Sequence, residues 1–283
     1  MFVVSKFFPD QGMIDAHCHL LQLLGKFSLY QIEQRARSIG IENIITCTCS
    51  FSDWSESLTV FSPKNDFFIP QYGIHPWWAD ENRPFDWLDR LREILEANPR
   101  SGVGEIGLDK NKAKKGVVSM AAQVEVFRAQ LKLACELRRT ATIHCVNAYG
   151  TLVDILREER GCLSAPVVIH SFSGNGDQIR DLVNACDKIF FSVSGLCPRT
   201  DVISHIPFHR LLIETDSPCM VIPSSDDQAI IGGITAIPKI DESTNDCAQL
   251  IWVADRIAKA TGRSIESIRS VSRENTLLAF PLV

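Results

Sequence analysis

The stretch Met13-Ile-Asp-Ala-His-Cys-His19 joins a short apolar run to a pair of histidines. Seven similar runs follow along the chain, each short, rich in β-branched or aromatic residues, and bounded by Gly, Pro, Asn or Asp, as buried strands are. We therefore predict eight strands, which cover residues 13–17, 43–47, 67–75, 101–107, 141–145, 167–170, 189–194 and 211–215.

Helical segments alternate with these runs. The longest, capped by Ser119, has an apolar face that includes Phe127 and Leu131, and two further helices are expected at 248–260 and 265–278. Apolar strands that alternate with helices indicate a parallel sheet covered on its faces, and eight units of about 29 residues suit a closed barrel. The prediction is an α/β fold, a (β/α)8 TIM barrel with one or two extra C-terminal helices. The rival, a doubly wound open sheet, lacks any Gly-x-Gly-x-x-Gly or P-loop string.

Composition is that of a folded globular protein: 283 residues, 45% hydrophobic and 22% charged. We expect a short extension over residues 1–12, one barrel domain over 13–283, and a loop over one barrel mouth at 223–246. The net charge of −5 argues against a nucleic-acid grip by the whole surface, but it permits a local basic patch.

Neither secretion nor membrane insertion is indicated. The ten cysteines form no Cys-x-x-Cys pair and sit mostly inside apolar runs, as reduced buried thiols do. The N-terminus lacks the features of a signal peptide, and no apolar run reaches the roughly 20 residues of a membrane span. We expect a cytoplasmic protein, with a nuclear pool open, that has no membrane partner and is a monomer.

Histidines and carboxylates follow the predicted strands at their C-terminal ends, where a parallel barrel builds its active site. His17 and His19 project to the same side of an extended strand, so both imidazoles can hold one metal ion. His144 and His170 come from neighbouring strands and can hold a second ion. Glu105 can bridge the two ions, and Asp216 lies near the first because strand eight adjoins strand one. Two divalent ions (Zn²⁺, Mn²⁺, Co²⁺ or Mg²⁺) suit these ligands.

Other polar residues near these strand ends are open to two interpretations. His75 is either a hydrogen-bonded structural residue or part of the site. Lys110 and Lys112, with Lys114 and Lys115, form either a solvated basic loop or a patch that attracts substrate phosphates. His205 and His209 are expected at the surface.

Seven strings in this order resemble the TatD family of metal-dependent deoxyribonucleases, within the amidohydrolase superfamily of barrels. They are Asp15-Ala-His-Cys-His-Leu20, Gly73-Ile-His-Pro76, Gly104-Glu-Ile-Gly-Leu-Asp109, the helix from Gln123 through Phe127 and Gln130 to Ala134, Ile143-His144, Val168-Ile-His170-x-Phe-Ser-Gly174 and Leu211-Leu-Ile-Glu-Thr-Asp-Ser-Pro218. The resemblance implies a hydrolase, typically a 3′→5′ exonuclease on DNA. It carries over His17, His19, Glu105, His144, His170 and Asp216 as metal ligands, and His75 as a residue near the substrate.

One departure bears on the substrate: Val146 stands where the family usually has an arginine, which removes a bidentate phosphate contact. The expected mechanism uses a water activated by two metals, with Asp216 as general base, Glu105 as bridging ligand and His75 as a donor to the leaving oxygen. Two alternatives stay open at this point. One is an amidohydrolase or esterase that acts on a small molecule, and the other is a non-catalytic adaptor that keeps the barrel.

Overall fold

The computed structural model describes residues 12–61, 65–196, 200–222, 229–239 and 243–280. Eight parallel strands occupy the predicted positions: β1 (Met13–Cys18), β2 (Ile41–Cys47), β3 (Phe68–Gln71), β4 (Val103–Asp109), β5 (Ala141–Val146), β6 (Val167–Ile169), β7 (Ile189–Val193) and β8 (Leu211–Ile213). The third strand is shorter than expected, because the chain beyond Gln71 leaves the ladder with β2. Of the predicted extension, residues 1–11 lie outside the described part.

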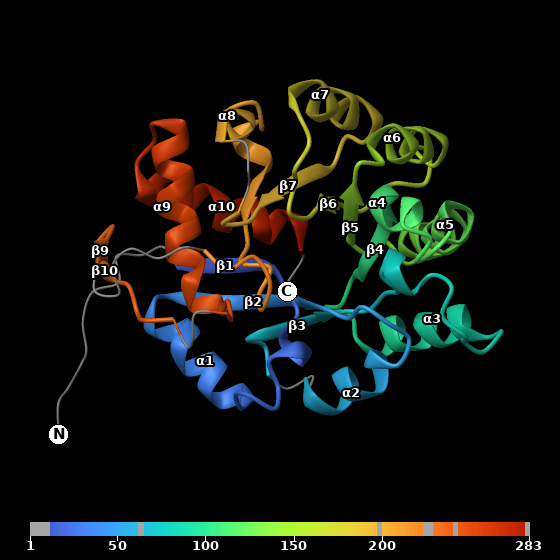
Figure 1. Cartoon of the computed structure of the whole chain (residues 1–283), viewed down its shortest axis with the longest axis horizontal. Coiled ribbons are helices and arrows are strands. Elements are labelled where there is room, and N and C mark those ends of the chain that lie inside the picture. The colour runs from blue at the N-terminus through green and yellow to red at the C-terminus, as the bar shows by residue number, and fades with distance from the viewer. Residues whose placement is uncertain (1–11, 62–64, 197–199, 223–228, 240–242, 281–283) are drawn as a thin grey trace.

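Helices surround the strands, as Figure 1 shows. They are α1 (Leu29–Ser38), α2 (Asp53–Val60), α3 (Trp87–Ala97), α4 (Lys110–Lys114), α5 (Met120–Leu137), α6 (Tyr149–Glu158), α7 (Gly176–Ala185), α8 (Thr200–Ile203), α9 (Leu250–Thr261) and α10 (Ile265–Ala279). Ser119 and Ser264 cap α5 and α10 by accepting bonds from Ala122 N and Ser267 N, as their sequences predict. No helix in the described ranges has the length and apolar character needed to cross a membrane.

The strands form two parallel sheets, ordered β1-β2-β3 and β4-β5-β6-β7-β8, whose edges meet at two seams of the barrel. At one seam Tyr72 bridges to Val103. At the other, Thr215 donates its N–H and its hydroxyl to the two carboxylate oxygens of Asp15, over 2.9 and 2.6 Å. Each seam is therefore held by a few specific bonds instead of a continuous ladder.

Two apolar layers stabilise the barrel. The larger lies between strands and helices, and it includes Ile44, Phe127 and Ile143. The smaller fills the barrel interior, where inward residues such as Ile45 and Val168 pack with Phe280, which follows α10. Phe280 is 2% exposed, so the end of the last helix closes the barrel on the side opposite the polar strand ends.

The prediction of an irregular loop at 223–246 is wrong for its described centre. Ile230–Ile231 (β9) and Ile234–Thr235 (β10) form a two-stranded antiparallel sheet that lies against α9. Gly232 and Gly233 make its turn with φ values of 54° and 78°, which a two-residue hairpin of this kind requires. Residues 223–228 and 240–242 lie outside the described part.

Candidate metal centre

The buried carboxylate of Glu105, on β4, lies at the middle of a group of imidazoles at the carboxyl ends of the strands. Its Oε2 lies 3.4 Å from His17 Nε2 and 3.1 Å from His19 Nε2. Its Oε1 lies 2.9 Å from His144 Nδ1 and 2.8 Å from His170 Nε2. Residues from β1, β4, β5 and the end of β6 thus converge on one carboxylate.

Asp216, three residues beyond the end of β8, completes the group. Its Oδ1 lies 3.7 Å from His17 Nε2 and 3.6 Å from His19 Nε2. The four histidines that the sequence offered as ligands therefore surround Glu105, and Asp216 lies next to His17 and His19. Asp216 has a φ of 53°, a left-handed conformation that non-glycine residues seldom adopt and that is concentrated at functional sites.

The spacing of the ring nitrogens fits divalent ions. His17 Nε2 and His19 Nε2 are 3.2 Å apart, and His144 Nδ1 and His170 Nε2 are 3.1 Å apart. Two nitrogens bound to one tetrahedral Zn²⁺ at about 2.0–2.1 Å would lie about 3.3 Å apart. Both oxygens of Glu105 are buried, and although imidazole nitrogens lie 2.8–3.4 Å away, none of these contacts has hydrogen-bond geometry in the described structure, an arrangement that a cation would relieve. The donor set therefore fits a metal.

The outer nitrogens of the same rings have partners that the sequence analysis did not assign to the site. Glu214 Oε1 lies 3.4 Å from His170 Nδ1, and Asp109 Oδ2 lies 3.6 Å from His144 Nε2. A carboxylate behind a metal-binding imidazole fixes its ring orientation and raises its basicity. Both acids end apolar strands, which was the available signal, but only the fold shows which ring each one faces.

Two thiols lie behind the other histidine pair. Cys47 Sγ is 3.4 Å from His17 Nδ1, and Cys49 Sγ is 3.3 Å from His19 Nδ1. Cys47 ends β2 and Cys49 lies two residues further on, the same spacing as between His17 and His19. Each cysteine therefore faces one histidine of the neighbouring segment. All nine described cysteines are free and seven are buried, in line with the expected reduced thiols.

His75 also faces Glu105, with Nε2 3.2 Å from Oε1. The backbone N–H of Trp77 donates to His75 Nδ1 over 3.1 Å, so in the neutral ring the proton sits on Nε2. Burial lowers the pKa of His75 to about 4, which favours this neutral form. His75 therefore presents an N–H to the site instead of a lone pair, which suits a hydrogen-bond donor better than a ligand.

Burial and neighbouring charges act in opposite directions on the pKa values of the titratable groups in this site. Burial alone would raise the pKa of Glu105, but attraction by His170 holds it well below the ordinary range. Conversely, burial would lower the pKa of His170, and the adjacent Glu105 raises it well above the usual value. Burial raises the pKa of Asp216, although the neighbouring imidazoles oppose the rise. A carboxylate with a raised pKa is a stronger base.

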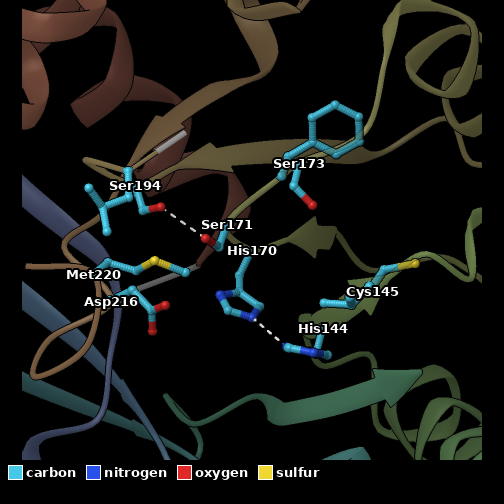
Figure 2. A pocket seen from close by; sticks show the side chains of 11 residues that line it. His144, Cys145, His170, Ser171, Ser173, Ser194, Asp216 and Met220 are labelled. Atoms are coloured by element: carbon cyan, nitrogen blue, oxygen red, sulfur yellow. Dashed lines mark hydrogen bonds between the residues drawn. The ribbon is translucent and has the colours of Figure 1, made fainter. Parts of the chain in front are cut away.

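A cavity of about 130 Å³ opens beside this cluster. Figure 2 shows His144, His170 and Asp216 along it, with the hydroxyls of Ser171 and Ser194 hydrogen-bonded to each other. Val146 lines the same cavity, so the position where the sequence lacks the family arginine does border the site.

The predicted basic residues follow β4 at the same end of the barrel. Lys110 is exposed on α4, and Lys112 is half-buried with its ammonium 3.7 Å from the centre of the Trp77 ring. Neither lysine contacts the Glu105 cluster in the described structure. His205 and His209 are exposed, as expected.

Two buried glutamines of α5 support the site from behind. Gln130 Oε1 accepts from Ile74 N over 2.7 Å, and Gln123 Oε1 accepts from Asp109 N over 2.7 Å. The amide groups of Gln123 and Gln130 also donate to the backbone carbonyls of Asp109 and Ile74, respectively. The helix thereby fixes the backbone next to His75 and at the end of β4.

Comparisons with known proteins show the family of this chain. The profile of the family described as TatD related DNase matches residues 14–281. A protein of Edwardsiella piscicida named 3′-5′ ssDNA/RNA exonuclease TatD is 27% identical over 91% of this chain and 96% of its own. The Bacillus subtilis uncharacterized metal-dependent hydrolase YabD is 28% identical over 95% of this chain and 98% of its own.

Solved structures show the same fold. The TatD homologue YJJV of Escherichia coli superposes with a TM-score of 0.78 at 23% identity, over 95% of this chain and 98% of its own. A TatD-family hydrolase of Entamoeba histolytica gives 0.78 at 20% identity, over 96% and 99%. The resemblance drawn from the strand-end strings is confirmed, and the chain belongs to the TatD-related DNase family.

Proposed function

We propose that this chain is a divalent-metal-dependent phosphodiesterase, a 3′→5′ exonuclease that acts on DNA. The observation that carries the proposal is the arrangement of four imidazole nitrogens within 3.4 Å of the two oxygens of buried Glu105. The name of the Edwardsiella relative, an ssDNA/RNA exonuclease, supports nucleic acid as the substrate class.

His17, His19, Glu105, His144, His170 and Asp216 would hold two divalent ions, with Zn²⁺, Mn²⁺ and Co²⁺ better suited to the imidazoles than Mg²⁺. Such ions supply Lewis acidity and lower the pKa of water towards neutrality. Asp216 accepts the proton of the attacking water at its carboxylate, and its burial favours that proton.

The neutral imidazole of His75 donates its Nε2–H towards the phosphoryl group or the departing 3′-oxygen. Lys110 and Lys112 attract the anionic backbone to this end of the barrel. Val146 supplies no charge beside the cavity. The proposed contacts with the phosphate are therefore assigned to His75, Lys110 and Lys112. The cytoplasmic location and the monomeric state stay predictions.

The test is hydrolysis of a 5′-labelled single-stranded DNA oligonucleotide by the purified protein. We expect 3′→5′ shortening that a chelator abolishes and that readdition of Zn²⁺, Mn²⁺ or Co²⁺ restores. Parallel assays with small esters and amides distinguish the nuclease from the alternative, an amidohydrolase or esterase that acts on a small molecule. Hydrolysis of those compounds without DNA cleavage would overturn the proposal.

A further inference from the structure

Trp77 is a large aromatic side chain that stays exposed next to the candidate metal centre. It belongs to the short 3-10 helix Pro76–Trp78, which follows His75, and 39% of its surface is exposed. Its ring stands edge-on to His75, with centroids 5.0 Å apart, and lies 6.3 Å from the ring of His144. The ring of Trp78 stacks on this indole, with centroids 6.0 Å apart and planes 24° apart, so only the remaining exposed part of the indole can contact a molecule that reaches the cluster.

The ring is held in a fixed orientation. Trp77 Nε1 donates to Asp109 Oδ2 over 2.7 Å. The other oxygen of Asp109 accepts from Asn111 N and Lys112 N over 2.9 and 3.0 Å, which caps α4. Because the indole is already oriented, a ligand that stacks on it loses little free energy to ordering.

A positive charge accompanies the ring. The ammonium of Lys112 lies 3.7 Å from the ring centroid of Trp77, within the range of a cation–π contact. Among the described residues no carboxylate lies within ion-pair distance of Lys112, so its ammonium is available to a phosphate. Lys110 and Lys114 add charge on the same helix.

We propose that Trp77 and Lys112 form a subsite for one nucleotide of a single strand, beside the scissile phosphate. The base stacks on the indole, and the ammonium that covers the ring turns to the adjoining phosphate. Every base has a flat face, so the subsite accepts any sequence but requires an unpaired base. This inference rests on the proposed nuclease function and deepens it by assigning the contact with an unpaired base and its phosphate to Trp77 and Lys112.

The test compares steady-state KM values for a single-stranded thymidine decamer at a fixed metal concentration. Base–aromatic stacking corresponds to about a 5- to 150-fold change in affinity, so Trp77→Ala should raise KM by that range. Trp77→Phe keeps a stacking face and should stay within about threefold of the wild type. Phe85→Ala is the matched control, because Phe85 is a fully exposed aromatic.

Decamers with one abasic nucleotide, placed at each of the three positions nearest the 3′ end, locate the subsite. At one position the wild type and Trp77→Ala should converge in KM, since no base remains to stack. Lys112→Ala should reduce the dependence of KM on salt.

Two results would overturn the subsite while leaving the nuclease intact. One is an unchanged KM for Trp77→Ala. The other is an equal loss in Trp77→Phe and Trp77→Ala with reduced metal content, which would assign Trp77 to the positioning of Asp109. Failure of the wild type to cleave any oligonucleotide with any readded metal would overturn the nuclease proposal and the subsite together.

Discussion

Replacement of Glu105 by glutamine tests the metal centre most directly. The change keeps the side-chain volume but removes the buried negative charge shared by His17, His19, His144 and His170. It also substitutes an amide NH₂ for one oxygen that now faces imidazole nitrogens at 2.8–3.4 Å. An NH₂ group has no lone pair for a cation.

The size of the effect follows from the burial of the site. Glu105 is 1% exposed, so solvent cannot replace its charge. Removal of one partner from a buried charged pair costs about 3–5 kcal/mol. At about 1.4 kcal/mol per factor of ten, metal affinity should fall by roughly two to four orders of magnitude.

The assay is competition of Zn²⁺ or Mn²⁺ between the protein and a fluorescent chelator, with metal content after dialysis and far-UV circular dichroism to verify the fold. Hydrolysis of the DNA oligonucleotide should fall in parallel. A folded Glu105→Gln protein that binds metal with wild-type affinity and still cleaves DNA would refute the reasoning.

Three further predictions concern the surroundings of the site. Glu214→Gln removes the negative charge that faces His170 Nδ1 and should reduce metal affinity or activity about 10- to 100-fold in binding and rate assays. The control Glu136→Gln, at an exposed position, should leave both unchanged. Burial raises the pKa of Asp15 from 3.8 to about 7, so its contribution to stability is full below pH 4 and is lost as pH rises through 7. Urea unfolding should therefore show the wild type losing about 3 kcal/mol more than Asp15→Asn between pH 5 and pH 8, and equal losses would contradict the assignment. Phe280→Ala leaves a cavity at the closed end of the barrel and should lower the free energy of unfolding by about 3–5 kcal/mol, measured by urea titration. An unchanged urea midpoint would contradict this prediction.

The sequence predicted the strands and the gathering of the candidate ligands around Glu105 because both have local signals. The run 141–145 begins with Ala141, Thr142 and Ile143, two of which are β-branched, and His144 then interrupts it near its C-terminal end. Parallel topology then brings all such ends to one side of the barrel. The convergence of His17 and Asp216, 199 positions apart in the sequence, needed no further information.

Features that depend on packing across the site could not be predicted in the same way. Asp109 and Glu214 are strand-end acids like Glu105. Nothing in the local sequence shows that these two acids face the outer nitrogens of His144 and His170, whereas Glu105 faces the inner ones. The sequence around Trp77 is equally compatible with an exposed and with a buried indole. The hairpin at Ile230–Thr235 did have a signal, since two glycines separate its β-branched pairs, but its strands are too short to stand out.

The division of the barrel into two sheets gives the metal centre a mechanical consequence. His17, His19 and His75 lie on or just after strands of the β1–β3 sheet, whereas Glu105, His144, His170 and Asp216 lie on or just after strands of the β4–β8 sheet. Divalent ions bound by both groups, as proposed, would link the two sheets across the two seams. Saturation at 1,000 times the dissociation constant adds about 4 kcal/mol to stability, so stripping the ions with a chelator should loosen the halves of the barrel and lower the melting temperature together with activity.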